Sequence, residues 1–218
     1  MELTKKETEK VERFLNNNKL TYIDIRFETY DHILTDIESI VKSQNIGFEK
    51  AFILVTNKWK KHFNETSSLY FGLYYSAPKM VIEKAKNYFK KFYFLYISTY
   101  FLPLILIQYL KAPIFVDIIS IVFPYLQAMA VIATFFFLFL MIKKRSTKAK
   151  TTYSFILKTQ NANLVLGLLI TVKFLFTDND SMMNPIWIAF NIVFLTSTFI
   201  YYIFYKKHIE ALKQNKIL

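Results

Sequence analysis

The sequence of 218 residues has no cysteine and only three glycines. Without cysteine the chain forms no disulfide bond, no thiolate zinc site and no thiol nucleophile. Gly47, Gly72 and Gly167 lie too far apart for a phosphate-binding loop or for the GxxxG motif that pairs membrane helices. The three histidines do not form the HExxH pattern of zinc hydrolases. These absences exclude the usual signatures of nucleotide-binding, thiol-dependent and zinc-dependent enzymes.

Apolar side chains, by contrast, are abundant: 54% of the residues are hydrophobic and 20% are charged. The apolar residues concentrate in four stretches, at residues 92–110, 115–142, 162–176 and 186–205. A helix that crosses the hydrocarbon core of a bilayer needs roughly 20 residues. The sequence therefore predicts an all-α polytopic membrane protein with four transmembrane helices.

The basic residues fall on alternate sides of these stretches. Clusters precede the first stretch, separate the second from the third and follow the fourth: Lys84, Lys86, Lys90 and Lys91; Lys143, Lys144, Arg145, Lys148 and Lys150; Lys206 and Lys207. The other two connections hold only Lys111, and then Asp178 and Asp180. Since basic loops stay on the cytoplasmic side, we expect an inner-membrane protein with both termini in the cytoplasm. The net charge of +12 is then explained by anionic lipid headgroups, with no nucleic acid as partner.

Residues 1–63 carry a different pattern, typical of a small cytosolic domain of three helices. Thr4 and Glu7 form a capping-box pattern at the start of the first helix. The second helix is expected from Thr21, with a buried stripe at Ile23, Phe27, Tyr30, Leu34, Ile37 and Val41, widened by Ile33 and Ile40. Gly47 is expected to end it in a left-handed conformation, and residues 48–63 form the third. No alternation with a period of two occurs, so we expect no sheet.

The second and third of these helices carry a recurrent pattern of polar residues. It reads Arg26-x-Glu28-x-x-Asp31-His32-x-x-x-Asp36-Ile37-Glu38 and continues as Gly47-Phe48-Glu49-Lys50-Ala51-Phe52. Over about 60 residues this resembles the HAAS-type signalling domain of bacterial membrane proteins. The resemblance implies a three-helix cytoplasmic module, followed by membrane spans, that takes part in regulating other proteins.

The polar cluster on the second helix allows several interpretations. Glu28, His32 and Asp36 recur every four residues and so share one face, where they could bind a metal ion or sense pH. The face could equally be a solvated surface, pack His32 against another helix, or dock a protein. We assign no metal and no cofactor, and take as docking candidates the polar members of the pattern: Arg26, Glu28, Asp31, His32, Asp36 and Glu38.

Residues 64–91 connect this domain to the spans. Residues 76–78 are expected to open a helix with Val81, Ala85 and Phe89 on its apolar side and lysines on the other. Such a helix would lie either on the membrane or on the N-terminal domain. The predicted organisation is thus a cytosolic domain at 1–63, a connector at 64–91, four spans within 92–205 and a cytosolic tail at 206–218.

Polar residues within the spans are expected to hold helices together. Asp117 and Lys173 should both lie near the outer surface and form an ion pair. Gln127 and Asn191 lie deeper, where they could form hydrogen bonds between helices.

These features favour a non-catalytic regulator or assembly subunit whose cytosolic domain docks a protein partner or a second copy. An accessory subunit of a transporter or secretion complex is the alternative. A lipid enzyme that uses His32, His62 or His208 ranks last, because the three histidines belong to different contexts.

Overall fold

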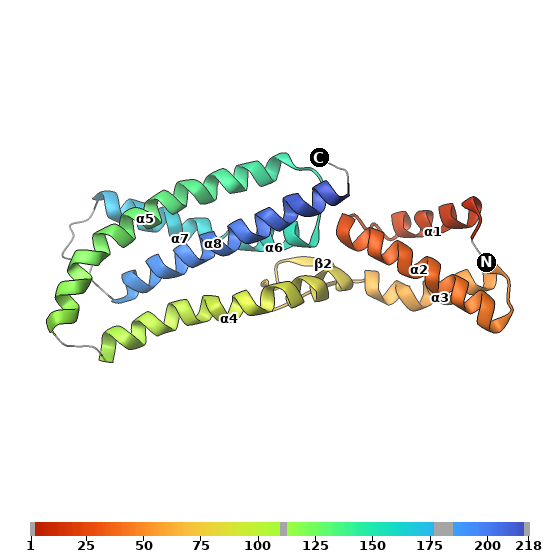
Figure 1. The fold of residues 1–218 in the computed structure, drawn as a ribbon, viewed down its shortest axis with the longest axis horizontal. Coiled ribbons are helices and arrows are strands. Elements are labelled where there is room, and N and C mark those ends of the chain that lie inside the picture. Colours follow the sequence, from red (N-terminus) through yellow and green to blue (C-terminus); the bar gives the residue numbers. More distant parts are fainter. Residues whose placement is uncertain (1–2, 110–112, 177–184, 216–218) are drawn as a thin grey trace. The chain divides into compact units, whose positions relative to one another are not determined.

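The structure is a computed structural model that describes residues 3–109, 113–176 and 185–215. It is 83% helical, so the predicted all-α class is confirmed (Figure 1). The chain divides into two compact units. Unit 1 comprises Met1–Asn87, Ala149–Phe155 and His208–Leu218, and unit 2 comprises Tyr88–Lys148 and Ile156–Lys207.

Unit 1 begins with the three predicted helices, α1 (Lys5–Asn17), α2 (Ile23–Gln44) and α3 (Phe48–Phe63). The capping box of Thr4 and Glu7 at the start of α1 is confirmed. Asn45, and not Gly47, adopts the left-handed conformation after α2, with φ of 50°. Gly47 is extended and precedes the first turn of α3, so the predicted role of this glycine is wrong.

The buried stripe of α2 differs from the predicted one. Ile25, Thr29, Ile33 and Ile37 are buried, whereas Phe27 is 54% exposed. The buried residues recur every four positions, and two of them, Ile33 and Ile37, belong to the predicted stripe. The sequence pattern was ambiguous because apolar residues occur on both sides of this helix.

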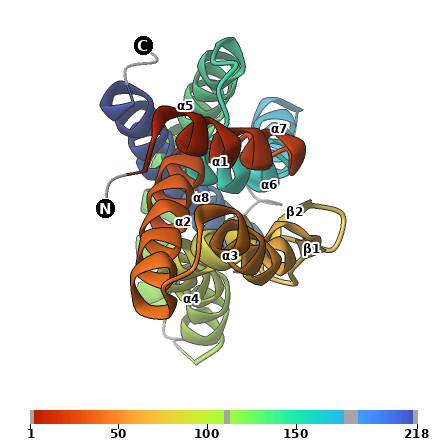
Figure 2. The same cartoon turned by 90° about the vertical axis from the view of Figure 1, so that its right-hand side faces the viewer.

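A hairpin follows α3, although no sheet was expected. Strand β1 (Glu65–Ser67) pairs antiparallel with β2 (Ser76–Pro78), and the loop between them projects from the side of the unit (Figure 2). Residues 76–78 are therefore a strand, and the helix predicted there, α4 (Lys79–Tyr109), begins at the next residue. Three residues in each strand are too few to show a period of two in the sequence.

Unit 2 contains long apolar helices. Its elements are the greater part of α4, α5 (Pro113–Ser146), the end of α6 (Thr152–Gln160), α7 (Asn163–Phe176) and most of α8 (Pro185–Gln214). A two-residue turn at Asn161 and Ala162 separates α6 from α7.

Three helical segments are long and apolar enough to cross a membrane: Asp117–Ser146, Thr152–Phe176 and Pro185–Gln214. On α5, Ile121, Ile132 and Phe135 expose about two thirds of their surface, as expected of side chains in contact with lipid. The chain is thus a helical membrane protein. The first predicted span, at residues 92–110, extends beyond the described part of α4.

Inside unit 2 the helices contact one another through aromatic rings. The ring of Phe137 on α5 lies 4.3 Å from that of Tyr201 and 6.1 Å from that of Phe194, both on α8, measured between centroids. All three side chains are fully buried. Nearer the start of both helices, Phe123 and Ile188 form a second apolar cluster.

Candidate docking face of unit 1

An aromatic and ionic cluster joins α2 to α3. The carboxylate of Asp36 accepts hydrogen bonds from Lys58 Nζ at 3.0 Å and from Trp59 Nε1 at 3.1 Å. The imidazole of His32 stacks on the indole of Trp59, with ring centroids 6.4 Å apart and planes inclined by 17°. The ring of His62 lies 5.7 Å from the same indole. We call this set the Trp59 face: His32, Asp36, Lys58, Trp59 and His62.

The charge of Asp36 is stabilised within this face. Burial raises the pKa of Asp36, but the hydrogen bonds from Lys58 and Trp59 and the electrostatic effects of Lys58 and His32 outweigh it. The net result holds the pKa of Asp36 below its usual value. The carboxylate is therefore ionised at neutral pH and fixes the indole of Trp59 in one orientation.

The remaining members of the predicted polar cluster lie apart from Trp59 or are engaged elsewhere. Glu28 forms an ion pair with Lys84 of α4, which attaches α2 to the start of that helix. Arg26 donates to the main-chain oxygen of Leu20 at 3.4 Å. Asp31 is exposed and Glu38 is half-buried. The six candidates therefore do not form a single site, because their neighbours on α3 and α4 divide them.

No group of three histidine, aspartate or glutamate side chains that could hold a metal ion occurs in the described part of the chain. What the Trp59 face offers is a different chemistry: a half-buried indole with an exposed imidazole beside it and a carboxylate–ammonium pair at its edge. Tryptophan surrounded by polar groups is typical of binding hot spots on protein surfaces. The sequence contained Trp59 and His62, but nothing in its pattern placed them next to His32.

A second cluster joins α2 to the segment before α6. The backbone N–H of Ile23 donates to the oxygen of Lys150 at 2.9 Å, and that of Thr152 donates to Asp24 Oδ1 at 2.9 Å. The carboxylate of Asp24 thus lies at the N-terminus of α6, where free backbone N–H groups and the helix dipole favour an acid. Burial, together with the negative charges of Glu65 and Asp24, raises the pKa of Tyr22 to about 12.

The same segment meets the C-terminal part of the chain. Thr151 Oγ1 lies 2.9 Å from Nδ1 of His208, and both residues are fully buried. Thr151 and Ser154 also cap each other, since the N–H of each donates to the hydroxyl of the other at 3.0 Å. We call this the His208 junction: Asp24, Thr151, Thr152, Ser154 and His208. Its contacts link residues 128 and 57 positions apart in the chain, so no local pattern could reveal them.

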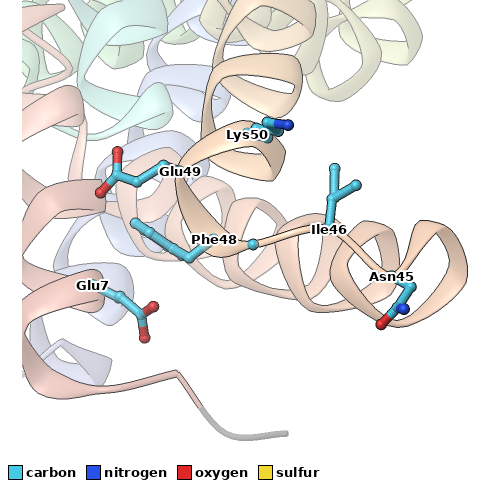
Figure 3. A pocket seen from close by; sticks show the side chains of 7 residues that line it. Glu7, Asn45, Ile46, Phe48, Glu49 and Lys50 are labelled. Atoms are coloured by element: carbon cyan, nitrogen blue, oxygen red, sulfur yellow. The ribbon is translucent and has the colours of Figure 1, made fainter.

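A pocket at the turn between α2 and α3 is lined by Glu7 of α1 and by residues 45–50 (Figure 3). Its two carboxylates lie on either side of Phe48, but both are already engaged (Figure 3). Glu7 caps α1 through Thr4, and Glu49 forms an ion pair with Lys10. The pocket therefore offers no carboxylate that lacks a protein partner, and its other lining side chains are Asn45, Ile46, Phe48 and Lys50.

The polar residues predicted to act within the spans have the following neighbours in unit 2. The ammonium of Lys173 lies 3.9 Å from the ring centre of Trp187, and within the described residues it forms no ion pair with the exposed Asp117. Gln127 and Asn191 are both buried. Asn191 donates to the oxygen of Trp187 one turn earlier on the same helix, at 2.7 Å.

Sequence reasoning missed a close contact between helices of unit 2. At Gly167 of α7, an added Cβ would lie 2.3 Å from Phe194 Cζ and 2.9 Å from Thr134 Oγ1. Thr134 and Thr171 both donate to the oxygen of Gly167, at 3.2 and 2.9 Å. A GxxxG search did not find this contact because a single glycine facing a ring and a hydroxyl has the same effect.

A second set of hydrogen bonds lies nearer the start of α7. Asn163 Nδ2 donates to Ser197 Oγ at 2.7 Å and to Gln160 Oε1 at 3.0 Å, and its oxygen accepts from Tyr96 at 3.3 Å. One amide thus bonds to side chains of α4, α6 and α8.

Comparison of the chain with family models, with curated proteins and with solved structures found no match.

Proposed function

We propose that the chain is a non-catalytic membrane regulator whose unit 1 binds a protein partner and acts on the spans through shared helices. One observation carries this proposal: α4, α6 and α8 each contain residues of both units. We propose that these shared helices carry a displacement of unit 1 to the spans. The resemblance of residues 26–52 to HAAS-type signalling domains supports the same function.

We further propose four spans with unit 1 in the cytoplasm. Unit 1 combines the N-terminal residues, the segment Ala149–Phe155 and the C-terminal residues from His208 onward. Segments that pack in one compact unit must lie on the same side of the membrane. This supports the arrangement inferred from the lysines, with an even number of crossings between each pair of segments. It also requires α4, with Phe92 to Tyr109, to cross as the first of the four.

The Trp59 face is the docking surface that we propose for the partner. The hydrogen bond to Asp36 and the stacked imidazole of His32 hold the indole of Trp59 in one orientation, so that binding costs little side-chain entropy. His32 is exposed, and Trp59 and His62 are each partly accessible. A partner with an apolar side chain that packs on the indole would complement this surface.

Site-specific photo-crosslinking in the native host tests this proposal. A photoreactive amino acid at His62 should trap a defined protein, whereas the same group at the exposed Lys6 of α1 should not. With the trapped protein purified, Trp59→Ala in the full chain should weaken its binding by more than about tenfold, and Lys60→Ala by less than about twofold.

Two further variants separate loss of binding from loss of folding. Trp59→Phe keeps an aromatic ring but removes the donor to Asp36, and His32→Ala alters an exposed side chain. Both should weaken binding while leaving the helix content unchanged. Equal binding of wild type, Trp59→Ala and His32→Ala would refute docking at this face, and equal trapping at His62 and Lys6 would refute it as well.

A further inference from the structure

The loop between β1 and β2 exposes apolar side chains more fully than any other part of unit 1. Leu69 is 82% exposed, Leu73 is 69% exposed and Tyr74 is 91% exposed. From Thr66 to Pro78 the chain carries no charged residue. Three large apolar side chains on one uncharged loop are unusual on a surface that faces only water.

The loop is nevertheless well ordered by its own contacts. Phe71 is buried, and its ring meets that of Phe155 edge to face with centroids 5.3 Å apart. Backbone hydrogen bonds close two turns, from Phe71 to Ser68 at 3.0 Å and from Tyr75 to Gly72 at 3.1 Å. Gly72 has a φ of +84°, which a residue with a side chain rarely adopts. The buried Phe71 thus anchors the loop, while its neighbours Leu69, Leu73 and Tyr74 remain exposed.

A contact with α4 places the loop along that helix. Lys86 Nζ lies 5.2 Å from the ring centre of Tyr70, two turns beyond the start of α4. Phe92, the first residue of the predicted span, follows six residues later, or about 9 Å along the helix axis. Tyr70 therefore lies beside α4, two turns after the start of this helix and about 9 Å along it before the predicted span.

The chemistry of the loop and its surroundings fits lipid. Tyrosine and leucine favour the boundary between headgroups and acyl chains, where an aromatic ring is apolar and its hydroxyl is hydrated. The exposed Lys86 lies beside Tyr70 of the loop and would attract anionic headgroups. The apolar side of α4 that could have touched the membrane is buried in protein at Val81, Ala85 and Phe89. Leu69, Leu73 and Tyr74 are the most exposed large apolar side chains in the described part of unit 1.

We infer that residues 68–75 insert Leu69, Leu73 and Tyr74 into the lipid–water interface and attach unit 1 to the membrane surface. This inference goes beyond the proposed function and does not depend on the Trp59 face. A loop that stays in water would not argue against docking at the Trp59 face. Likewise, the absence of a partner at the Trp59 face would not argue against insertion of the loop.

The absence of cysteine makes the test direct, because one introduced cysteine is the only thiol in the chain. The full-length variants Leu73→Cys and Tyr74→Cys carry an environment-sensitive nitrobenzoxadiazole dye in vesicles of phosphatidylcholine and phosphatidylglycerol. Ser43→Cys, at an exposed polar position of α2, is the control in water. Ile132→Cys, at an exposed apolar position of α5, is the control in lipid. Lipids with a nitroxide near the headgroup quench a dye at the interface, and iodide quenches a dye in water.

At positions 73 and 74 we expect blue-shifted emission and lipid quenching several-fold stronger than at position 43, with protection from iodide. Emission and quenching equal to those at position 43 would overturn the inference. A blue shift without lipid quenching that disappears on dilution in detergent would assign the loop to contact between two copies, and so would overturn it too. Because both side chains are exposed, neither cysteine disturbs the packing of unit 1.

Discussion

Replacing Gly167 by alanine should destabilise unit 2, although alanine is the better helix former. The added Cβ would lie 2.3 Å from Phe194 Cζ and 2.7 Å from its Cε2, where ordinary contacts begin at 3.4 Å. The ring must therefore move by about 1 Å, yet Phe194 is fully buried and lies against Phe137. Movement of Phe194 alone cannot relieve the contact, since Thr134 Oγ1 is also only 2.9 Å from the added atom.

The two opposing effects differ in size. Exchange of glycine for alanine inside a helix stabilises by about 1 kcal/mol. Overpacking a closely packed core costs about 1–3 kcal/mol, and loss of the hydrogen bond from Thr134 to the oxygen of Gly167 adds about 0.6 kcal/mol. We therefore expect a net destabilisation of about 0.6–2.6 kcal/mol for Gly167→Ala and a larger one for Gly167→Leu.

Tryptophan fluorescence can measure the stability of unit 2 in the full chain, because Trp59 and Trp187 are the only two tryptophans of the sequence. In a Trp59→Phe background, Trp187 reports on unit 2 during unfolding in mild detergent. Leu168→Ala, on the same helix but 45% exposed, is the matched control and should change stability little. Adding Phe194→Leu to Gly167→Ala should restore part of the loss, since it removes the atoms in contact. Gly167→Ala as stable as wild type, or more stable, would refute the close packing of α7 on α8.

The other predictions concern unit 1, with Trp59 as the fluorescent reporter in a Trp187→Phe background. Because the pKa of Asp36 is lower in the folded state, its carboxylate stabilises unit 1 above pH of about 4 and that contribution disappears as the pH falls through the folded pKa. Asp36→Asn should therefore be less stable than the parent at pH 7, by under about 1 kcal/mol for this partly exposed pair. The difference should vanish in acid, and a difference that persists unchanged at low pH would contradict the assignment. At the His208 junction, Thr151→Val should cost about 1–2 kcal/mol because it removes both a helix cap and a buried hydrogen bond, and Thr151→Ser should cost much less. Equal stabilities of these two variants would show that the hydroxyl contributes nothing.

Local patterns predicted the helices of this chain well. The capping box at Thr4, the helix over 48–63 and the apolar stretch that became α7 are all properties of consecutive residues. Helix formation depends on such short-range signals, so the sequence contains them directly. The sequence also predicted membrane-spanning helices, because a helix that crosses a bilayer must be long enough and apolar enough to do so.

Contacts between distant residues were not predictable in this way. The hairpin forms because two three-residue strands meet beside α4, and neither strand has a recognisable pattern of its own. His208 was considered only as a histidine near the membrane, whereas it is fully buried against Thr151. Pairing over such separations is decided by the shape and hydrogen bonding of the folded chain, on which a single sequence gives no information.

The polar face of α2 shows how far helical periodicity can be trusted. The spacing of four residues predicts that Glu28, His32 and Asp36 project from the same side of α2. It could not show what covers that side. Lys84 of α4 meets Glu28, and Lys58 and Trp59 of α3 meet Asp36, so two acids that looked available to a partner hold helices together. An acid in an ion pair within the protein must lose that pair before it can bind a partner. We therefore expect the aromatic residues of the Trp59 face to make the main contacts with a partner. Of these, the sequence pattern contained only His32.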